Sequence, residues 1–447
     1  MRATADYLIH ADAIAAEIAA GRLKPGDRLP PQRTFAYAKG IAVSTASRVY
    51  AELLRRGLVV GEVGRGTFVA GRPGQTYVRG EPRDGTIDLE FNFPAIPEQA
   101  RIFADCLAGL QRADVAASAT GPVTARQIDQ GRDVVCTFLS TRHWQPSSEG
   151  FVFTGSGRQA IAAALAALAP IGSRIAVEAL SYPMLKTIAQ RIGASLVPIA
   201  MDENGLEPAA LARAHRKAAI SALYVQPVMH NPLGISMNAE RRADLVRTAR
   251  ALGIMIIEDM VYGFLSDAPP LAVMAPEQCI VVDSLSKRLA PGLSVGMLHV
   301  PQAMRDRVWF IARGGAWTVP SLAFHAAMRL MQDGAAAEIV RLKRRDARLR
   351  QAIMAKLFDG FDIAADPGAY HIWLRLPEGW RSEAFAAAAA RVGVAVTPSH
   401  AFTMAPGHAP NAVRLALGLP SHEELRIAGE RLVGLLRRPP EYADVTE

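Results

Sequence analysis

The sequence predicts a small N-terminal α+β domain, a large α/β domain and a smaller C-terminal α+β domain. Residues 1–70 contain three helical patterns followed by two β-prone runs around a glycine-rich turn. From about residue 87, short apolar runs alternate with helical segments, which favours a largely parallel sheet covered by helices on both faces. Past about residue 330, a basic helix leads into an α+β segment.

The order of helix, helix, helix and hairpin in residues 1–70 is the outline of a winged helix-turn-helix. The third helix is expected from about Ser44 to Arg56, with Val49 and Leu53 one turn apart on its core face. The run GLVVGEVGRGTFVA supplies the hairpin. Residues 71–86, GRPGQTYVRGEPRDGT, are rich in glycine, proline and charge, so their composition predicts a linker.

The large domain is expected over residues 87–330, and its apolar runs predict buried strands. These runs are FVFT at 151, RIAV at 174, ALYV at 222, IMII at 254, CIVV at 279 and GMLHV at 296. The small domain is expected over residues 331–447, where GAYHIWLRLP and NAVRLALG predict strands.

Composition narrows the class of protein. The formal net charge of +8 permits a nucleic-acid partner without demanding one. Three widely spaced cysteines give neither a disulfide framework nor a metal cluster, which favours a reducing compartment. The chain opens without a signal-type apolar core, and its longest apolar run, AIAAALAALAPIG, is short and broken by Pro170. We therefore expect a cytoplasmic protein with no membrane-spanning segment and no metal site.

Basic residues are concentrated in the N-terminal domain. Residues 1–70 hold ten basic and six acidic residues, an excess of +4 that is half of the whole chain's +8. Such charge neutralises DNA phosphates, and small hydroxyl residues at a helix start approach DNA closely. Charge alone leaves a solvated basic face equally open. Candidate contacts at the start of the third helix are Ser44, Thr45 and Arg48, and those at the wing tip are Arg65 and Gly66.

The succession GRLKPGDRLPPQR, STASRVYAELLRRGLV and GEVGRGTFV resembles the winged-helix domain of the GntR superfamily over its whole length. The resemblance implies operator DNA as a partner. The residues it nominates for DNA contact are Arg33, Ser44, Thr45, Arg48, Arg65 and Gly66. The chain departs from the family's usual residues at Phe35, Ala42 and Val43.

Five polar clusters in the large domain each follow an apolar strand. They are FTGSGRQA, EALSYPM, NPLG, EDMVYG and SLSK. Ligands of open α/β sheets bind at the carboxyl ends of the strands, where all five clusters fall. A cofactor held as a Schiff base needs a lysine amine, a carboxylate at its ring nitrogen, a flat side chain over the ring and a phosphate cradle at a helix N-terminus.

Each cluster offers one of these parts, and each also has a structural alternative. Ser156, Gly157 and Arg158 can meet a phosphate, although FTGSGRQA alone also reads as a strand-to-helix turn. Tyr182 can cover a ring or belong to ordinary packing. Asn231 can donate to a ring hydroxyl, or NPLG can be a plain turn.

The last two clusters carry the charged groups. Asp259 and Tyr262 are three residues apart and can reach one pocket, where a buried Asp259 needs a cationic partner such as a pyridinium. Lys287, preceded by Ser284 and Ser286, follows CIVVD directly. Most lone lysines are solvated, and only this position at a strand end favours a catalytic lysine.

The ordered set NPxG, Asp-x-x-Tyr and Ser-x-Ser-Lys resembles the fold-type-I aminotransferases across residues 87–440. The resemblance implies bound pyridoxal 5′-phosphate. It assigns Lys287 to the Schiff base, Asp259 to the ring nitrogen, Asn231 and Tyr262 to the ring hydroxyl, and Tyr182 to stacking. In NAVRLALG, Arg414 matches the arginine that grips a substrate carboxylate, with a structural salt bridge as the alternative.

One residue departs from that family's pattern. Related proteins usually read PGLR where this chain reads PGLS, so Ser294 replaces an arginine that pairs with the cofactor phosphate. Either Arg158 or Arg288 is a candidate to compensate; without compensation, cofactor binding is expected to be weak.

Together the two halves resemble the MocR-type regulators, which fuse a GntR winged helix to an aminotransferase-like domain. The resemblance implies a cytoplasmic transcription regulator and a head-to-tail, domain-swapped homodimer. The effector is expected to be an amine, an amino acid or the cofactor itself, sensed through an aldimine at Lys287. Two alternatives stay open: an active aminotransferase with a DNA-binding appendage, and a cofactor-free domain used only for dimerisation. Residual transaminase activity is compatible with the regulator.

Overall fold

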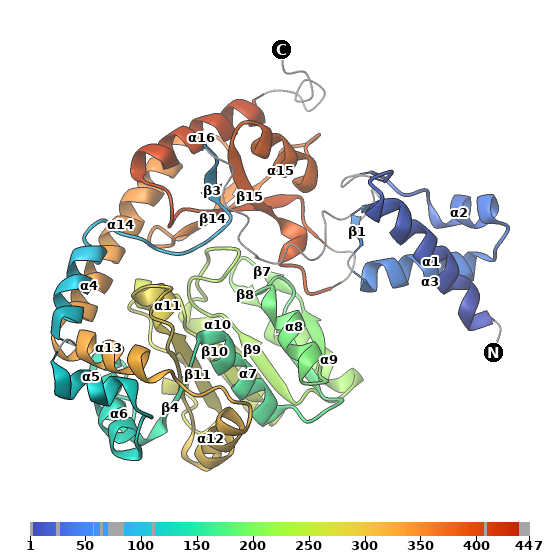
Figure 1. Ribbon diagram of the computed structural model, residues 1–447. Coiled ribbons are helices and arrows are strands. Elements are labelled where there is room, and N and C mark those ends of the chain that lie inside the picture. The colour runs from blue at the N-terminus through green and yellow to red at the C-terminus, as the bar shows by residue number, and fades with distance from the viewer. Residues whose placement is uncertain are drawn as a thin grey trace.

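The computed structural model describes residues 3–23, 27–56, 58–62, 66–69, 85–109, 112–405 and 409–437. Its architecture confirms the predicted fold class: a winged helix-turn-helix, a large α/β domain and a smaller α+β domain (Figure 1).

The N-terminal domain contains the expected three helices and hairpin. These are α1 (Ala3–Ala19), α2 (Gln32–Lys39), α3 (Val43–Arg55), β1 (Val59–Glu62) and β2 (Gly66–Val69). The strands β1 and β2 pair antiparallel. Phe35, an unusual residue for this position, is buried and meets Tyr50 edge-on with ring centroids 5.6 Å apart. Val49 and Leu53 of α3 are fully buried beside them, as the one-turn spacing predicts.

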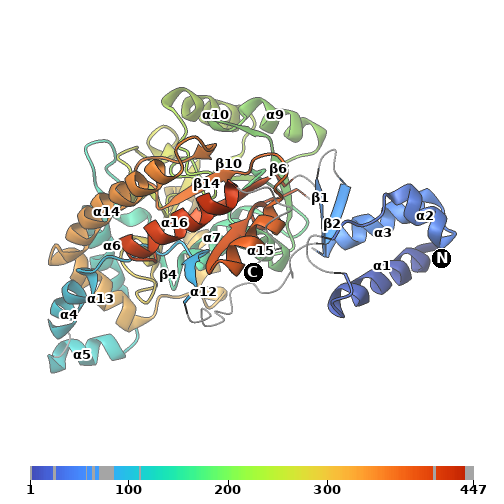
Figure 2. The ribbon, with the colours of Figure 1, turned by 90° about the horizontal axis from the view of Figure 1, so that it is seen from above.

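This domain stands to one side of the other two, with β1 and β2 nearest to them (Figures 1 and 2). One contact between the domains joins the hairpin to the small domain. The guanidinium of Arg381 lies 3.3 Å from the ring centroid of Phe68 in β2. A cation over an aromatic face is attracted by the ring quadrupole, so this contact favours the observed placement.

The large domain is built on one mixed sheet with the strand order β4-β12-β11-β10-β9-β5-β6. Its strands from β11 to β6 are parallel, whereas β12 runs antiparallel to both β11 and β4. The strands are β4 (Phe151–Thr154), β5 (Arg174–Glu178), β6 (Ser195–Ile199), β9 (Ala222–Val225), β10 (Met255–Asp259), β11 (Cys279–Ser284) and β12 (Gly296–His299). Each of the six apolar runs identified in the sequence is therefore a strand of this sheet.

Helices cover the two faces of this sheet. They are α6 (Ala125–Leu139), α7 (Gly157–Leu168), α8 (Met184–Arg191), α9 (Pro208–Lys217), α10 (Ala239–Ala251), α12 (Arg305–Gly314) and α13 (Ser321–Gln332). Alternate residues of β11 face opposite sides: Val282 packs in the cluster that contains α7, while Val281 packs in the cluster on the other face. The short helix α11 (Leu285–Arg288) follows β11 directly and so starts at the carboxyl edge of the sheet.

The small domain contains a second sheet with the order β13-β14-β16-β15-β3. Its strands are β3 (Ile87–Leu89), β13 (Ile363–Ala364), β14 (His371–Arg375), β15 (Val394–Pro398) and β16 (Ala412–Ala416). The helices α14 (Ala335–Leu357), α15 (Ser382–Arg391) and α16 (His422–Leu436) belong to the same domain. The strand β3 lies within the expected large domain, yet it pairs parallel with β15. A boundary at residue 87 therefore does not separate the two domains cleanly.

The other described elements lie within the domains or between them. They are α4 (Gln99–Ala108), α5 (Ala113–Thr120), the hairpin of β7 (Met201–Asp202) and β8 (Gly205–Leu206), and the 3-10 turns Ser148–Gly150, Gly263–Leu265, Leu271–Val273, Gln302–Met304 and Ser399–Ala401. None of the helices in the described ranges has the length and apolar character needed to cross a membrane.

Candidate cofactor site and DNA-binding face

Lys287 lies on α11, at the carboxyl edge of the large sheet. Ser284 caps this helix, because its hydroxyl accepts a hydrogen bond from the backbone amide of Ser286 at 3.3 Å. The Lys287 Nζ donates to the carbonyl of Asn92 at 2.5 Å and lies 3.4 Å from the ring centroid of Phe93. Burial, and then the nearby Arg414, lowers the pKa of Lys287 well below its usual value. A lowered pKa favours the neutral amine, which is the nucleophilic form of a lysine.

Asp259 ends β10 and is buried. Its Oδ2 accepts a hydrogen bond from the Tyr224 hydroxyl at 2.5 Å, and its Oδ1 accepts one from the Val261 amide at 2.9 Å. Burial raises the pKa of this carboxyl to about 6, against the effect of the Tyr224 hydrogen bond. Within the described part of the chain, no basic side chain forms an ion pair with Asp259. Such a carboxylate is suited to a cationic ligand atom.

Arg414 comes from β16 of the small domain and reaches into the large domain. Its Nη1 donates to Asn231 Oδ1 at 3.1 Å, and both side chains are buried. The peptide bond between Asn231 and Pro232 is cis. Tyr262 is buried as well, with its ring centroid 5.6 Å from that of His371. The expected substrate-binding arginine thus meets the NPLG cluster at the junction of the two domains.

Tyr182 lies beyond the end of β5 and is partly buried. It packs against the apolar cluster that contains α7. Burial is the main cause that raises the pKa of Tyr262, and the neighbouring Tyr182 adds to it. The structure therefore brings Tyr182 into the same group of side chains as Tyr262.

The turn between β4 and α7 closes tightly on the strand that precedes Lys287. Ser156 caps α7, its hydroxyl accepting from the Gln159 amide at 3.2 Å. A Cβ at Gly157 would lie 2.8 Å from the Cβ of Ser284, and a Cβ at Gly296 would lie 2.2 Å from the Ser156 carbonyl oxygen. Only glycine fits at these two approaches. The free amides at the start of α7 make this turn a suitable anion cradle.

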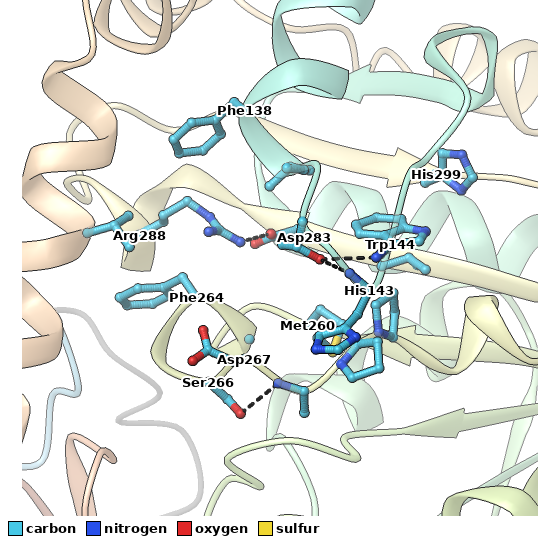
Figure 3. A pocket seen from close by; sticks show the side chains of 18 of the residues that line it. Phe138, His143, Trp144, Met260, Phe264, Ser266, Asp267, Asp283, Arg288 and His299 are labelled. Atoms are coloured by element: carbon cyan, nitrogen blue, oxygen red, sulfur yellow. Dashed lines mark hydrogen bonds and ion pairs between the residues drawn. The ribbon is translucent and has the colours of Figure 1, made fainter.

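Two arginines were candidates to replace the missing phosphate partner at Ser294. Arg158 is exposed at the first turn of α7 and is close enough to contribute to the lowered pKa of Lys287, whose main cause is burial. Arg288 instead forms an ion pair with Asp283 and lies between Phe138 and Phe264 (Figure 3). Its Nη2 is held by Asp283, so Arg158 remains the candidate cation at the cradle.

Sequence reasoning missed several residues of this site. Asn92 and Phe93 meet the Lys287 amine from a segment almost two hundred positions earlier, and Tyr224 is the partner of Asp259. No motif spacing connects Asn92 to Lys287, because tertiary folding alone makes the contact. The contact of Tyr224 with Asp259 could have been predicted, because ALYV and IMII are both strands and neighbouring parallel strands bring polar residues near their ends together.

A neutral lysine amine, a buried carboxylate and a helix N-terminus lie together at one sheet edge. This arrangement suits a phosphorylated pyridine with an aldehyde group: the amine for the aldehyde, Asp259 for the ring nitrogen and the α7 amides for the phosphate. The two glycine approaches bring the backbone of the cradle close to β11 and β12, and Asp259 has no ion-pair partner among the described residues. The residues present therefore fit pyridoxal phosphate.

Most of the candidate DNA contacts that the structure describes are exposed. Arg33 on α2 and Ser44 and Arg48 on α3 are exposed, and Thr45 is half-buried. Gly66 begins β2 with a φ of +122°, a conformation that favours glycine. Arg65 lies outside the described residues. Sequence reasoning missed Tyr37 of α2, which is 92% exposed although aromatic.

Comparison with known protein families identifies two regions of the chain. Residues 127–432 match the model for aminotransferase class I and II, and residues 10–69 match that for bacterial regulatory proteins of the gntR family. The HTH-type transcriptional regulator YdeF of Bacillus subtilis is 28% identical, covering 97% of this chain and 94% of its own. The vitamin B6 salvage pathway transcriptional repressor PtsJ of Salmonella typhimurium is 27% identical, covering 89% of this chain and 91% of its own.

Solved structures share the fold of the two C-terminal domains. An archaeal alanine:glyoxylate aminotransferase superposes with a TM-score of 0.72 at 22% identity, covering 79% of this chain and 91% of its own. LysN, an α-aminoadipate aminotransferase of Thermus thermophilus, gives 0.70 at 23% identity, covering 81% and 95%. The chain therefore belongs to the aminotransferase class I and II family and carries a gntR-family DNA-binding domain, the organisation of the MocR-type transcription regulators.

Proposed function

We propose that this protein is a pyridoxal-phosphate-dependent transcription regulator that binds operator DNA and senses an amine or amino acid at Lys287. The observation that carries the proposal is the joint placement of Lys287 and Asp259 at one sheet edge, in a chain whose first domain is a winged helix. When bound, the cofactor supplies an aldehyde that condenses reversibly with primary amines, the lysine side chain included.

Each residue of the site has a defined task in this proposal. Lys287 anchors the cofactor through its neutral amine, and Asp259 holds a proton on the ring nitrogen. Asn231 and Tyr262 bind the ring hydroxyl, while Tyr182 covers the ring. The α7 amides, with Ser156 and Arg158, hold the phosphate.

An effector carboxylate is bound by Arg414. Its planar guanidinium already donates to Asn231, so it is oriented toward the cofactor site before the effector arrives. Because Arg414 belongs to the small domain, the bound carboxylate draws the two domains together. The effector then shifts DNA binding only as far as it prefers one domain arrangement to the other.

We propose that the regulator acts in the cytoplasm as a domain-swapped homodimer. Exposed apolar side chains on two helices that follow one another in the chain support a dimer. Trp309 and Phe310 of α12 are 43% and 71% exposed, and Leu322 of α13 is 59% exposed. A dimer presents two winged helices to two operator half-sites.

The test is quantitative footprinting of the purified protein on its own upstream region, with and without cofactor and candidate amines. An effector-dependent change in operator affinity, lost in Lys287→Ala, is expected. Operator binding that ignores every amine while the protein converts amino donor and keto acceptor would favour the alternative, an aminotransferase with a DNA-binding domain. Because Lys287 and Asp259 are both present, transaminase activity should be measured in the same experiment.

A further inference from the structure

A second cavity opens on the face of the large sheet opposite α7. Its volume is about 590 Å³, and its floor includes Val281 and Asp283 of β11 and Met297 of β12. Leu298 and Val282, which alternate with these residues, pack in the cluster with α7. The cavity and the cradle for the cofactor phosphate are thus on opposite faces of one sheet.

Arg288 and Asp283 form a buried ion pair in this cavity (Figure 3). Only 9% of Arg288 and 5% of Asp283 are exposed. The guanidinium carbon lies 5.6 Å from the ring centroid of Phe138 and 5.5 Å from that of Phe264. The Arg288 Nε is buried and has no hydrogen-bond partner among the described residues. An unmet donor on a buried guanidinium is costly, and an acceptor from a ligand would satisfy it.

The rest of the lining defines the class of ligand. Aromatic and thioether side chains supply apolar walls, namely Phe138, Trp144, Met260, Phe264 and Met297. Four arginines line the cavity, against the two acidic residues Asp267 and Asp283. Arg288, Arg341 and Arg344 form ion pairs with Asp283, Glu338 and Asp267, which leaves Arg142 as the lining arginine without an ion pair among the described residues. Its positive charge favours an anion, and the flat apolar walls favour an aromatic body.

We propose that this cavity is a second ligand site, which binds a small aromatic carboxylate. The carboxylate accepts from the Arg288 Nε, and the ring packs among Phe138, Phe264 and Met260. The site is separate from the cofactor site, because Lys287 points toward Asn92 whereas its neighbour Arg288 points toward Asp283.

Two elements connect the second site to Lys287. Arg288 shares the four-residue helix α11 with Lys287. The helix α14 lines the cavity through Val340 and Arg344, and its buried Lys343 donates from Nζ to the Lys287 carbonyl at 3.1 Å and to the Leu289 carbonyl at 2.6 Å. A ligand in the cavity therefore contacts both elements that hold Lys287 in place. If a ligand in the cavity changes the affinity of the protein for the cofactor, the cofactor must change the affinity of the protein for that ligand by the same factor.

Isothermal titration calorimetry with phenylacetate tests the site on the full-length protein, with and without cofactor. One phenylacetate per chain is expected, with a Kd below about 1 mM. Benzylamine, which has the same ring and the opposite charge, should not bind to the cofactor-free protein. Ala337→Phe, at an exposed position of the lining, should weaken phenylacetate binding at least about tenfold. The matched control is Ala355→Phe, exposed on the same helix outside the cavity, which should leave binding unchanged.

Three outcomes would overturn the proposal. The first is no binding heat at millimolar phenylacetate. The second is equal phenylacetate binding by Ala337→Phe and wild type. The third is loss of binding in Arg414→Gln together with retained binding in Ala337→Phe, which would place the phenylacetate at the cofactor site. If Ala337→Phe does not fold, Arg288→Lys replaces it, because lysine keeps the charge and lacks the Nε donor. Phenylacetate binding by a protein that takes up no cofactor would contradict the proposed function and leave the second site standing.

Discussion

Lys287 and Arg288 are neighbours on α11, but their side chains point to different groups and have different partners. The Lys287 amine meets Asn92 and Phe93, whereas the Arg288 guanidinium is held by Asp283 and two phenylalanine rings. Burial lowers the pKa of Lys287, which forms no ion pair among the described residues, whereas the buried Arg288 is paired with Asp283.

Replacing Lys287 with alanine should abolish the visible absorbance band that the purified protein gains with pyridoxal phosphate. The band requires a covalent amine partner, and the neutral amine of Lys287 is the expected one. Absorbance spectroscopy measures it, with Lys356→Ala, an exposed lysine of α14, as the control. A band of wild-type intensity in Lys287→Ala would show that another amine holds the cofactor.

Asp259 should make the cofactor-free protein less stable as the pH rises from about 4 to about 6. Its folded-state pKa of about 6 is above the ordinary value, so the native state keeps a proton that the unfolded state has lost in this window. The contribution is full below pH 4 and is lost through pH 6, by about 1 to 3 kcal/mol. Urea unfolding of wild type and Asp259→Asn measures it, and identical pH slopes would contradict the raised pKa.

At the scale of elements, α2 and α3 are the helices to which we assign DNA binding. Arg33→Ala should weaken operator binding by about tenfold at constant salt, since one phosphate-neutralising cation is lost. Gel-shift titrations measure the affinity, and the cofactor band should stay unchanged. Arg216→Ala, at an exposed site on α9, is the charge-matched control. Equal losses in both variants would mean that net charge, not the position of Arg33, determines affinity.

The packing of α14 against α11 makes a second pH-dependent prediction. Burial lowers the pKa of Lys343 to about 7, so between about pH 7 and 10.5 the unfolded state binds a proton that the native state does not. The free energy of unfolding should therefore rise with pH in this window, by at most about 1.4 kcal/mol per pH unit from this residue. Lys343→Met should lack that component between pH 7.5 and 9.5, and Lys356→Met should retain it. A slope equal to wild type in Lys343→Met would place the titration elsewhere.

At the scale of the whole molecule, the exposed side chains of α12 suggest how two chains meet. Phe310→Asp should shift the protein from dimer to monomer at micromolar concentration, because a buried aromatic contributes heavily to an interface and an unpaired carboxylate there is costly. Light scattering after size-exclusion chromatography gives the mass. Ile171→Asp, at an 89% exposed apolar residue outside α12 and α13, should remain dimeric. A monomeric wild type would refute the dimer itself.

The fold class follows from sequence, and the cofactor-site residues could be nominated from it, because their signals are local. The residues Ser-Leu-Ser-Lys and Glu-Asp-Met-Val-Tyr each follow an apolar strand directly, so the sequence alone predicts that they lie at the carboxyl edge of the sheet. Asn92, Phe93 and Tyr224 were missed because their contacts arise between segments distant in the chain. The pairing of β3 with β15 was missed for the same reason, and so was the cavity beneath Arg288.

The pairing of β3 with β15 determines where this protein can be cut and rejoined. Moving the DNA-binding domain onto another aminotransferase by joining the chains before residue 87 would leave both β3 and its partner β15 behind. A chimera that carries Ile87–Leu89 along with the reader needs a recipient edge that accepts this strand in register. The small domain also contacts the DNA-binding domain directly, through Arg381 and Phe68, so it is the domain to which the DNA-binding domain is attached. Modular exchange between such regulators should succeed where that edge strand is exchanged together with its partner.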